Sequence, residues 1–515
     1  MIKDSLYWAD QKAKEIIEKR RKKQYVCASG VSPSGVVHIG NLREVMVTHF
    51  VSESIKDYSK NSKHIHSWDD YDRFRKVPAG VPKHYENYVG MALSEIPDPF
   101  GCHDSYAVHF EKEFEESIEK LNLKIEFHSQ YKMYRSCVYS ESIKKVMNSR
   151  KEVAEILDKY RKEPLPADWY PVQIYCERCK KDTTKVVEYD ENYKIKYKCQ
   201  CNYENEFDFR KTGIVKLRWK ADWPMRWDYN KVDFEPGGTE HSTAGSSRDV
   251  GIQIQKKVFK TEPPLYQVYH FIKLKGQKKK LSGSEGKTLN INALAKYYTP
   301  SLIKFFYAKP RPDTDVVLPL DEDLIKFYDD FYRTEEVYYN KDVENQKKMN
   351  QLIRIYEKSI ISPLPKKLPL QLSFRTAVML SQMCLSKKVL NQMDVHPKTK
   401  FDEERLNMLT LCAKNWLDDY APDKYKLELS DKKVSLNKKE KLLFSEFLKS
   451  ISENTDSDLI QNIFYNLSKK YELNIREIFE KAYIILINDN KGPKIGTLIV
   501  ALGISNVKKR IKKLI

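Results

Sequence analysis

Two stretches of the sequence carry residues of the kind that bind a polyphosphate. The first, "GVSPSGVVHIGN" at 30–41, is a Gly/Ser/Pro turn that leads into His38 and Asn41. A glycine-bearing loop between a strand and a helix presents backbone N–H groups at a helix N-terminus, which favours an anion. Gly40 would let a flat or bulky group lie against the backbone. Alone, the pattern is more typical of a structural turn.

The second stretch, "KKKLSGSEGKTL" at 278–289, lies about 240 residues further on. Lys280 could meet a polyphosphate, and Ser282, Ser284 and the neighbouring glycine N–H groups could surround it. Alone, the stretch could equally be an exposed basic loop. Together, a histidine near the first strand and a lysine loop near the last could stabilise a pyrophosphate leaving group from two sides, as nucleotidyl transfer requires.

Two other groups of residues have the types and spacing of metal ligands. "CERC" (176–179) and "CQC" (199–201) supply four thiols, which predict a closed, structural zinc ribbon rather than four free buried thiols. "DPFGCHDSYAVH" supplies a carboxylate, a thiol and two imidazoles, although a capping aspartate with two ordinary histidines is the alternative. The candidate ligands are Cys176, Cys179, Cys199 and Cys201, and Asp98, Cys102, His103 and His109.

The elements around the first stretch predict an open α/β sheet. Residues 25–28 form a short apolar strand, residues 42–58 have helical periodicity, and residues 64–68 form a second strand. Asp69, Asp70 and Asp72 follow that strand. Ligands of such sheets bind at the carboxyl ends of the strands. The acidic cluster could therefore accept a buried ammonium group, or it could be a solvated strand end.

The predicted fold class is α/β: a Rossmann-like parallel-sheet catalytic domain with a zinc-binding insertion, followed by an all-α C-terminal domain. The proline-rich "SPLPKKLP" at 362–369 must interrupt helices and marks a boundary. The predicted parts are the first catalytic half at 1–90, the insertion at 91–210, the second catalytic half with the lysine loop at 211–290, a helical region at 291–370 and the helical domain at 371–515.

Charge and composition indicate the kind of partner. Lys and Arg number 91 against 72 Asp and Glu, a net charge of +19, which favours nucleic acid, although a lysine-rich organism could also explain it. Nine cysteines without an export signal argue against a disulfide framework. The longest apolar run, at 495–504, is too short to span a bilayer. We therefore expect a cytoplasmic protein without a membrane partner.

The two opening stretches resemble the signature motifs of class I aminoacyl-tRNA synthetases. "HIGN" at 38–41 is similar to their HIGH motif, and "KLSGS" at 280–284 is similar to their KMSKS loop. The loop has Gly283 where many relatives have lysine, so Lys280 and Lys287 would supply its charge. Within the class, the chain resembles the class I type of lysyl-tRNA synthetase. The resemblance runs through 29–44, 67–78, 97–110, 222–229, 232–238, 279–287 and 307–312.

This resemblance implies ATP-dependent activation of lysine and lysyl transfer to the 3′-terminal ribose of a lysine tRNA. Magnesium would accompany ATP, both metal groups would hold zinc, residues 291–370 would contact the tRNA stem, and 371–515 would bind the anticodon. No DNA partner is expected. The implied residues are His38, Lys280, Ser282 and Ser284 for catalysis; Ser34, Gly35, His38, Gly40, Asn41 and Lys280 for ATP; and Gly30, Ser32, Asp72, Trp219, His241 and Tyr269 for lysine.

Two alternatives remain open at this point. A class I synthetase for glutamate would carry an arginine in the first strand to hold the substrate carboxylate, but that place is Ala28. The acidic cluster also opposes a second carboxylate. A non-catalytic tRNA-binding relative would have lost chemistry, yet His38, Lys280, Ser282 and Ser284 are all present.

Overall fold

The structure is a computed structural model that describes residues 5–275, 289–361, 363–383, 387–426, 429–492 and 494–515. The predicted catalytic residues Lys280, Ser282 and Ser284 therefore lie outside the described residues. The chain divides into two compact units. Unit 1 comprises 1–294, 300–318 and 341–363, and unit 2 comprises 295–299, 319–340 and 364–515.

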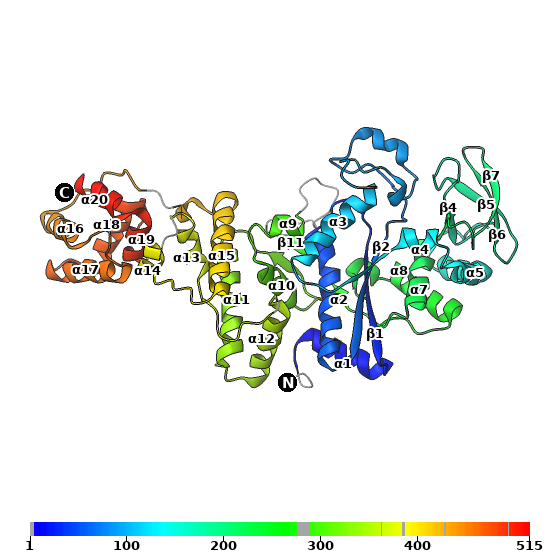
Figure 1. The fold of residues 1–515 in the computed structure, drawn as a ribbon, viewed down its shortest axis with the longest axis horizontal. Coiled ribbons are helices and arrows are strands. Elements are labelled where there is room, and N and C mark those ends of the chain that lie inside the picture. The colour runs from blue at the N-terminus through cyan, green and yellow to red at the C-terminus, as the bar shows by residue number, and fades with distance from the viewer. Residues whose placement is uncertain (1–4, 276–288, 362, 384–386, 427–428, 493) are drawn as a thin grey trace. The chain divides into compact units, whose positions relative to one another are not determined.

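Unit 1 is a mixed α/β structure (Figure 1). Its strands are β1 Gln24–Val31, β2 Asn61–Trp68, β3 Glu126–Ser129, β4 Val172–Ile174, β5 Thr184–Tyr189, β6 Lys194–Cys199, β7 Glu204–Asp208, β8 Val215–Leu217, β9 Gly237–Gly238, β10 Val268–Tyr269, β11 Ile272–Leu274 and β12 Val316–Leu318. Its α-helices are α1 Trp8–Arg20, α2 Ile39–Asp57, α3 Tyr106–Glu119, α4 Gln130–Arg135, α5 Ser140–Asn148, α6 Arg150–Asp158, α7 Trp219–Asn230, α8 Ser247–Ile254, α9 Ile291–Leu294, α10 Pro300–Ala308 and α12 Gln346–Ser359.

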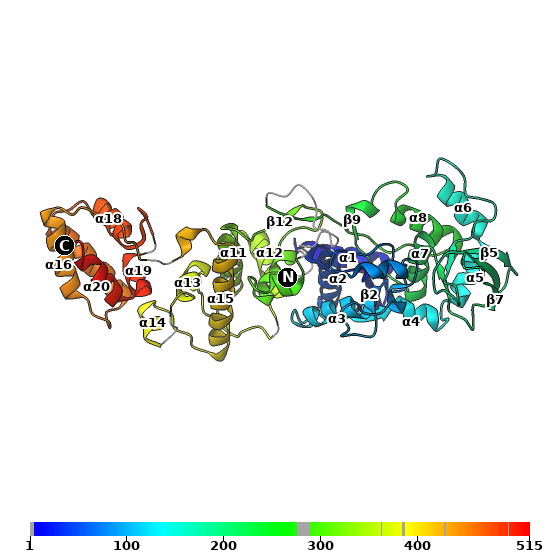
Figure 2. The same ribbon diagram turned by 90° about the horizontal axis from the view of Figure 1, so that it is seen from above.

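The predicted parallel sheet is present in unit 1. Strands β1, β2 and β3 pair in parallel in that order, with Gly30 opposite Ser67. Single parallel bridges from Cys27 to Phe234 and from Phe234 to Leu265 continue the pairing beyond β1. Helix α2 connects β1 to β2 and packs on both strands, and it also contacts α1 and α10, so most of its residues are buried rather than those of one face. Figure 2 shows α2 beside β2. The carboxyl ends of β1 and β2 therefore meet at one edge.

The inserted segment and the chain that follows it share an apolar core. Strand β4 of the insertion pairs antiparallel with β8, which lies in the predicted second catalytic half at 211–290. One cluster of buried side chains contains Cys176 and Cys199 together with Ala221 and Met225 of α7. Strands β5, β6 and β7 form a separate antiparallel sheet.

Unit 2 is helical in its described residues, as predicted for the C-terminal part. Helix α11 belongs to it and contacts α13, with the rings of Tyr328 and Phe374 stacked at 4.2 Å. No helix in the described part of the chain combines the length and apolar character that a membrane span needs. The helices of unit 2 are α11 Asp323–Asn340, α13 Phe374–Leu380, α14 Lys387–Gln392, α15 Lys400–Asp419, α16 Lys438–Ser450, α17 Ser457–Lys470, α18 Ile475–Ile487, α19 Ile495–Leu502 and α20 Ile504–Lys512.

Candidate active site

His38 is the N-cap of α2. Its Nδ1 atom accepts hydrogen bonds from the N–H groups of Gly40 and Asn41, at 3.0 and 3.3 Å, and the Asn41 side chain accepts one from His38 N–H. With Nδ1 an acceptor, the neutral ring carries its proton on Nε2. A Cβ atom at Gly40 would lie 2.8 Å from this ring, so the glycine makes room for His38 itself rather than for a ligand.

A cavity of about 420 Å³ opens beside His38. It is lined by four of the predicted ATP residues, Ser34, Gly35, His38 and Asn41, and Gly40 is not among its lining residues. The predicted lysine contacts Ser32 and Asp72 line the same cavity. The loop after β2 thus lies across from the first loop, as the strand order predicted. The sequence interpretation missed the cations of this wall, which are Arg73, Arg75 and Lys76.

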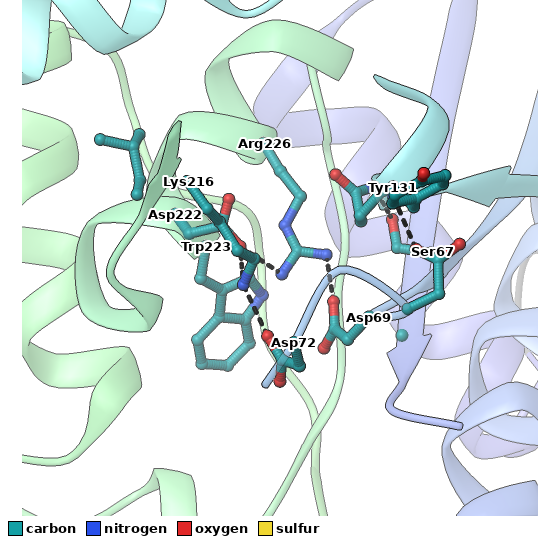
Figure 3. A network of polar contacts seen from close by, with 12 residues as sticks. Ser67, Asp69, Asp72, Tyr131, Lys216, Asp222, Trp223 and Arg226 are labelled. Carbon is teal, nitrogen blue, oxygen red and sulfur yellow. Dashed lines mark hydrogen bonds and ion pairs between the residues drawn. The ribbon is translucent and has the colours of Figure 1, made fainter. Parts of the chain in front are cut away.

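The acidic cluster after β2 is paired with two cations of the chain (Figure 3). Asp72 accepts from the ammonium of Lys216 at 2.6 Å, and Asp69 accepts from Arg226 at 2.7 Å. Asp222 lies 3.0 Å from Arg226 and 3.7 Å from Lys216. Burial opposes the charge on Lys216, but the three carboxylates outweigh it and raise its pKa. Three carboxylates against two cations leave one negative charge when all are ionised.

Asp70 has a different environment from its neighbours. It accepts from the backbone N–H of Tyr131 at 2.7 Å and from the hydroxyl of Ser129. Burial raises its pKa to about 6. Its side chain therefore fixes the start of α4 to the end of β2, and it has a structural role.

Glu44 joins two of the predicted lysine contacts. Its Oε1 atom accepts from Gly30 N–H at 2.8 Å, and its Oε2 atom accepts from the hydroxyl of Tyr269 at 2.7 Å. Burial raises the pKa of Glu44 to about 8, against the lowering effect of these hydrogen bonds. Across the described residues, Glu44 forms no ion pair. A shielded carboxylate without a cation is costly unless a ligand supplies one.

Arg43 fixes the position of Tyr269 relative to Glu44. Its guanidinium donates to the backbone oxygens of His270, Pro312 and Thr314, at 2.7, 3.0 and 2.9 Å. These bonds connect α2 to the segment that follows β10. Sequence reasoning missed Glu44 because it follows the motif residues within the same helix, where a lone glutamate is usually solvated.

The remaining predicted lysine contacts, Trp219 and His241, belong to a group of aromatic side chains that also includes Trp223. The ring of Trp219 stacks on Trp223 at 5.2 Å, and the ring of His241 meets Trp223 edge-on at 5.3 Å. The guanidinium of Arg226 lies 5.1 Å from the centre of the Trp219 ring. Arg226 also binds Asp69, so the aromatic group and the acidic cluster share one cation (Figure 3). Trp219 and His241 are thus brought to the cluster, although neither lines the cavity beside His38.

Glu235 orients this aromatic group. The indole N–H groups of Trp223 and Trp227 both donate to its carboxylate, the first at 3.0 Å. Burial raises the pKa of Glu235 to about 7. Ala28 packs in the same apolar cluster as these two tryptophans, so the strand position that would carry an arginine for glutamate is occupied by a small residue within a core.

Both predicted metal-ligand groups converge. The thiols of Cys176 and Cys201 lie 3.7 Å apart, those of Cys179 and Cys199 lie 3.6 Å apart, and all four sulfurs lie within 4.8 Å of one another. In the second group, the Cys102 sulfur lies 3.1 to 3.3 Å from His103, His109 and Asp98. Each group offers four donors of the types that hold zinc.

The parallel sheet is followed after its first strand by a helix that His38 caps, beside a cavity lined by cations. This arrangement is consistent with the class I synthetase fold. The family model described as tRNA synthetases class I (K) matches residues 6–360, and the chain belongs to this family.

The relatives match over nearly the whole chain. The lysine–tRNA ligase of Pyrococcus horikoshii is 38% identical, over 98% of this chain and 99% of its own length. That of Thermococcus kodakarensis is 39% identical over the same shares. That of Borrelia garinii subsp. bavariensis is 37% identical over 99% of both chains.

Proposed function

We propose that this chain, a lysine–tRNA ligase by its family and its full-length relatives, activates lysine with ATP and transfers it to the 3′-terminal ribose of a lysine tRNA. The observation that carries the choice of amino acid is Glu44. It is a shielded carboxylate fixed by Gly30 and Tyr269 without a cation among the described residues. The ε-ammonium of lysine supplies that missing charge.

ATP occupies the cavity beside His38 in this proposal. The α-carboxylate of lysine attacks the α-phosphorus, the bond to the bridging oxygen of the β-phosphate breaks, and pyrophosphate leaves. His38 Nε2–H, Arg75 and Lys76 face the growing negative charge, and the proposed roles of Lys280, Ser282 and Ser284 are the same. Magnesium would arrive with ATP and share this charge. The 3′-terminal ribose hydroxyl then attacks the lysyl carbonyl, and AMP leaves.

The α-ammonium of lysine is assigned to the acidic cluster. Asp72 lines the same cavity as His38, and its group of three carboxylates and two cations carries one surplus negative charge when all five groups are ionised. The two ammonium groups of lysine are thus matched by Asp72 at one end and Glu44 at the other. Trp219 and His241 are proposed to bound the aliphatic stem between them.

The same arrangement opposes glutamate. The side-chain carboxylate of glutamate would meet Glu44 and no cation among the described residues, and a shielded carboxylate left without a cation costs about 2 kcal/mol or more. The position for a compensating arginine is Ala28, which is buried against Trp223 and Trp227.

Both four-donor groups are proposed to hold structural zinc. Four thiols at one group, and one carboxylate, one thiol and two imidazoles at the other, leave no open position for a catalytic water. Asp98 also accepts backbone N–H bonds from Phe100, Cys102 and His103, which fixes the loop that carries its neighbours. Zinc would therefore stabilise the insertion rather than take part in the reaction.

The helical unit 2 is proposed to bind the tRNA anticodon, and a cytoplasmic location stays a prediction.

The most direct test of the function is charging of total tRNA with each of the twenty amino acids. Incorporation of lysine alone is expected, and glutamate incorporation above lysine contradicts the proposal. ATP–pyrophosphate exchange, run with tRNA present, separates a ligase from a tRNA-binding protein without chemistry.

A further inference from the structure

A second cavity of about 420 Å³ lies in unit 1, where the segment after α6 meets the start of α7. Trp219, the first residue of α7, forms part of its wall and also belongs to the aromatic group of the candidate active site. The residues lining this cavity and those lining the cavity beside His38 do not overlap. The second cavity is therefore separate from the first, and Trp219 connects it to the aromatic group of the candidate active site.

The walls of this cavity are apolar and aromatic. Leu157 and Leu165 of the insertion face it together with Trp169 and Pro171, and Trp219 lines it from α7. A pocket of a few hundred Å³ with walls of this kind is suited to a flat ring. Trp169 offers a large π face, on which any nucleobase stacks, whereas one face of Trp219 is already stacked on Trp223.

Cations stand at the rim. Arg161, Arg218 and Lys220 all line the cavity. Arg218 is exposed, and its Nε donates to the backbone oxygen of Tyr170 at 3.3 Å, which orients its guanidinium without neutralising it. Lys220 donates to the backbone oxygen of Gly245 at 2.9 Å and likewise keeps its charge. Guanidinium groups held in this way match the geometry of a phosphate.

The cavity is preformed. The hydroxyl of Tyr160 donates to Asp249 at 2.8 Å, which joins the end of α6 to α8. Gly245 has φ +73°, and a Cβ atom there would lie 2.8 Å from the Tyr160 ring, so the backbone can approach this ring only as glycine. A ligand would enter these walls with little rearrangement.

We propose that this cavity binds an unpaired nucleotide next to the 3′ end of the tRNA, with its base between the apolar walls and its phosphate at Arg218. The inference rests on the proposed function, because it takes tRNA as the substrate. The lysyl group is proposed to lie beside Trp219 and must meet the terminal ribose, so the preceding nucleotides must pass near this residue. A free nucleotide would satisfy the same chemistry, and the test distinguishes the two sources.

The test compares the affinity of the full-length protein for a lysine tRNA transcript and for the same transcript without its last two nucleotides. In the unmodified protein, removal of these nucleotides should weaken binding about tenfold, since stacking of one base and one phosphate contact are both lost. Trp169→Ala and Arg218→Gln should each abolish most of that difference, and both should bind the shortened transcript as the unmodified protein does.

A matched control separates this effect from a general loss of charge. Lys198→Gln removes one exposed cation from β6 of the same insertion and should weaken both transcripts equally. Trp169→Phe, which keeps an aromatic face, should restore most of the difference and guards against a folding defect.

Two results overturn the proposal. One is that Trp169→Ala or Arg218→Gln still loses about tenfold in tRNA affinity when the transcript is shortened. The other is binding of cytidine or adenosine monophosphate at this cavity that intact tRNA does not displace, which assigns it to a free nucleotide. Lysine charging at saturating tRNA tests the proposed function separately, because it should persist in all of these variants.

Discussion

The carboxylate of Glu44, in α2, accepts a 2.7 Å hydrogen bond from the hydroxyl of Tyr269, in β10, across 225 residues of sequence. The second oxygen of Glu44 is held by Gly30 N–H at the end of β1. The end of β1, the following helix α2 and the distant strand β10 thus fix one carboxyl group in a single orientation. A carboxyl group held this firmly needs only to lose its proton, and not to reorient, when an ammonium group arrives.

Glu44→Gln should therefore impair the use of lysine selectively. Loss of one partner of a shielded charge pair costs about 2 kcal/mol or more, so kcat/KM for lysine should fall about 30-fold or further. The KM for ATP should stay nearly unchanged. Tyr269→Phe is the matched control: it keeps the carboxylate and should cost about fivefold. Equal losses for lysine and ATP would show that Glu44 is structural.

Lysine binding should depend on pH through the same residue. The pKa of Glu44 is about 8 in the free protein, so at pH 7 the carboxyl is mostly protonated and must lose its proton to pair with the ammonium. Affinity should rise about tenfold per pH unit up to about pH 8 and then level off. Calorimetry in buffers of different ionisation enthalpy should detect the released proton. Glu44→Gln should remove this slope.

The same raised pKa also has a consequence for stability. Because the folded value lies above that of the unfolded chain, the stability that Glu44 contributes is complete below the unfolded pKa and is lost as the pH rises through about 8. Saturating lysine should offset this loss. Thermal unfolding of the free and lysine-bound protein between pH 6 and 9 measures it, and a constant difference between the two would contradict the assignment.

His38 combines a structural and a chemical role that two substitutions can separate. His38→Ala removes both the N-cap of α2 and the Nε2 donor, so it should lower stability by about 1 kcal/mol and activation about a hundredfold. Asparagine is a good N-cap and should restore stability without restoring activation. Unfolding and pyrophosphate exchange measure the two effects. Normal turnover in His38→Asn would show that the ring has no part in the reaction.

Metal analysis should find about two zinc ions per chain. Cys176→Ser should lose one ion and destabilise the insertion, whereas Cys137→Ser, outside both four-donor groups, should keep both. An average close to one ion in the unmodified protein would show that the group at Asp98, Cys102, His103 and His109 does not hold metal.

The exposed lysines of α20 offer a test of the helical unit. Lys509 and Lys512 are exposed, whereas Arg510 is buried and donates to the backbone oxygen of Ile485. If the two lysines contact phosphates, the double change Lys509→Gln and Lys512→Gln should lower the slope of log affinity for tRNA against log salt by about two. An unchanged slope would place the tRNA on another surface.

The sequence predicted the parts of the site that depend on local order. Because parallel strands bring their carboxyl ends together, the loop at His38 and the residues after β2 could be placed at one edge from the pattern alone. The convergence of the four cysteines was likewise predicted from ligand types and spacing, whereas that of Asp98, Cys102, His103 and His109 was favoured by the family resemblance. These features depend on a few residues close together in the chain.

The pairing of charges could not be read from the sequence. Asp72 was predicted to contact lysine, and the structure adds a partner that the sequence did not indicate, the ammonium of Lys216, which lies 144 residues further on. Glu44 could not be recognised from the sequence either, because its hydrogen bond with Tyr269 joins residues 225 positions apart. A long-range hydrogen bond depends on how separate elements pack, and neither residue type nor periodicity specifies that.

Helix α7 contributes side chains both to the core of the insertion and to the candidate active site. Ala221 and Met225 lie in one apolar core with Cys176 and Cys199 of the insertion, while Trp219, Trp223 and Arg226 form part of the candidate active site. The insertion is therefore not a separable module. An engineer who shortened it to make a smaller enzyme would remove the support of the helix that carries the aromatic wall, and a chimaera with another insertion would need a new core against α7.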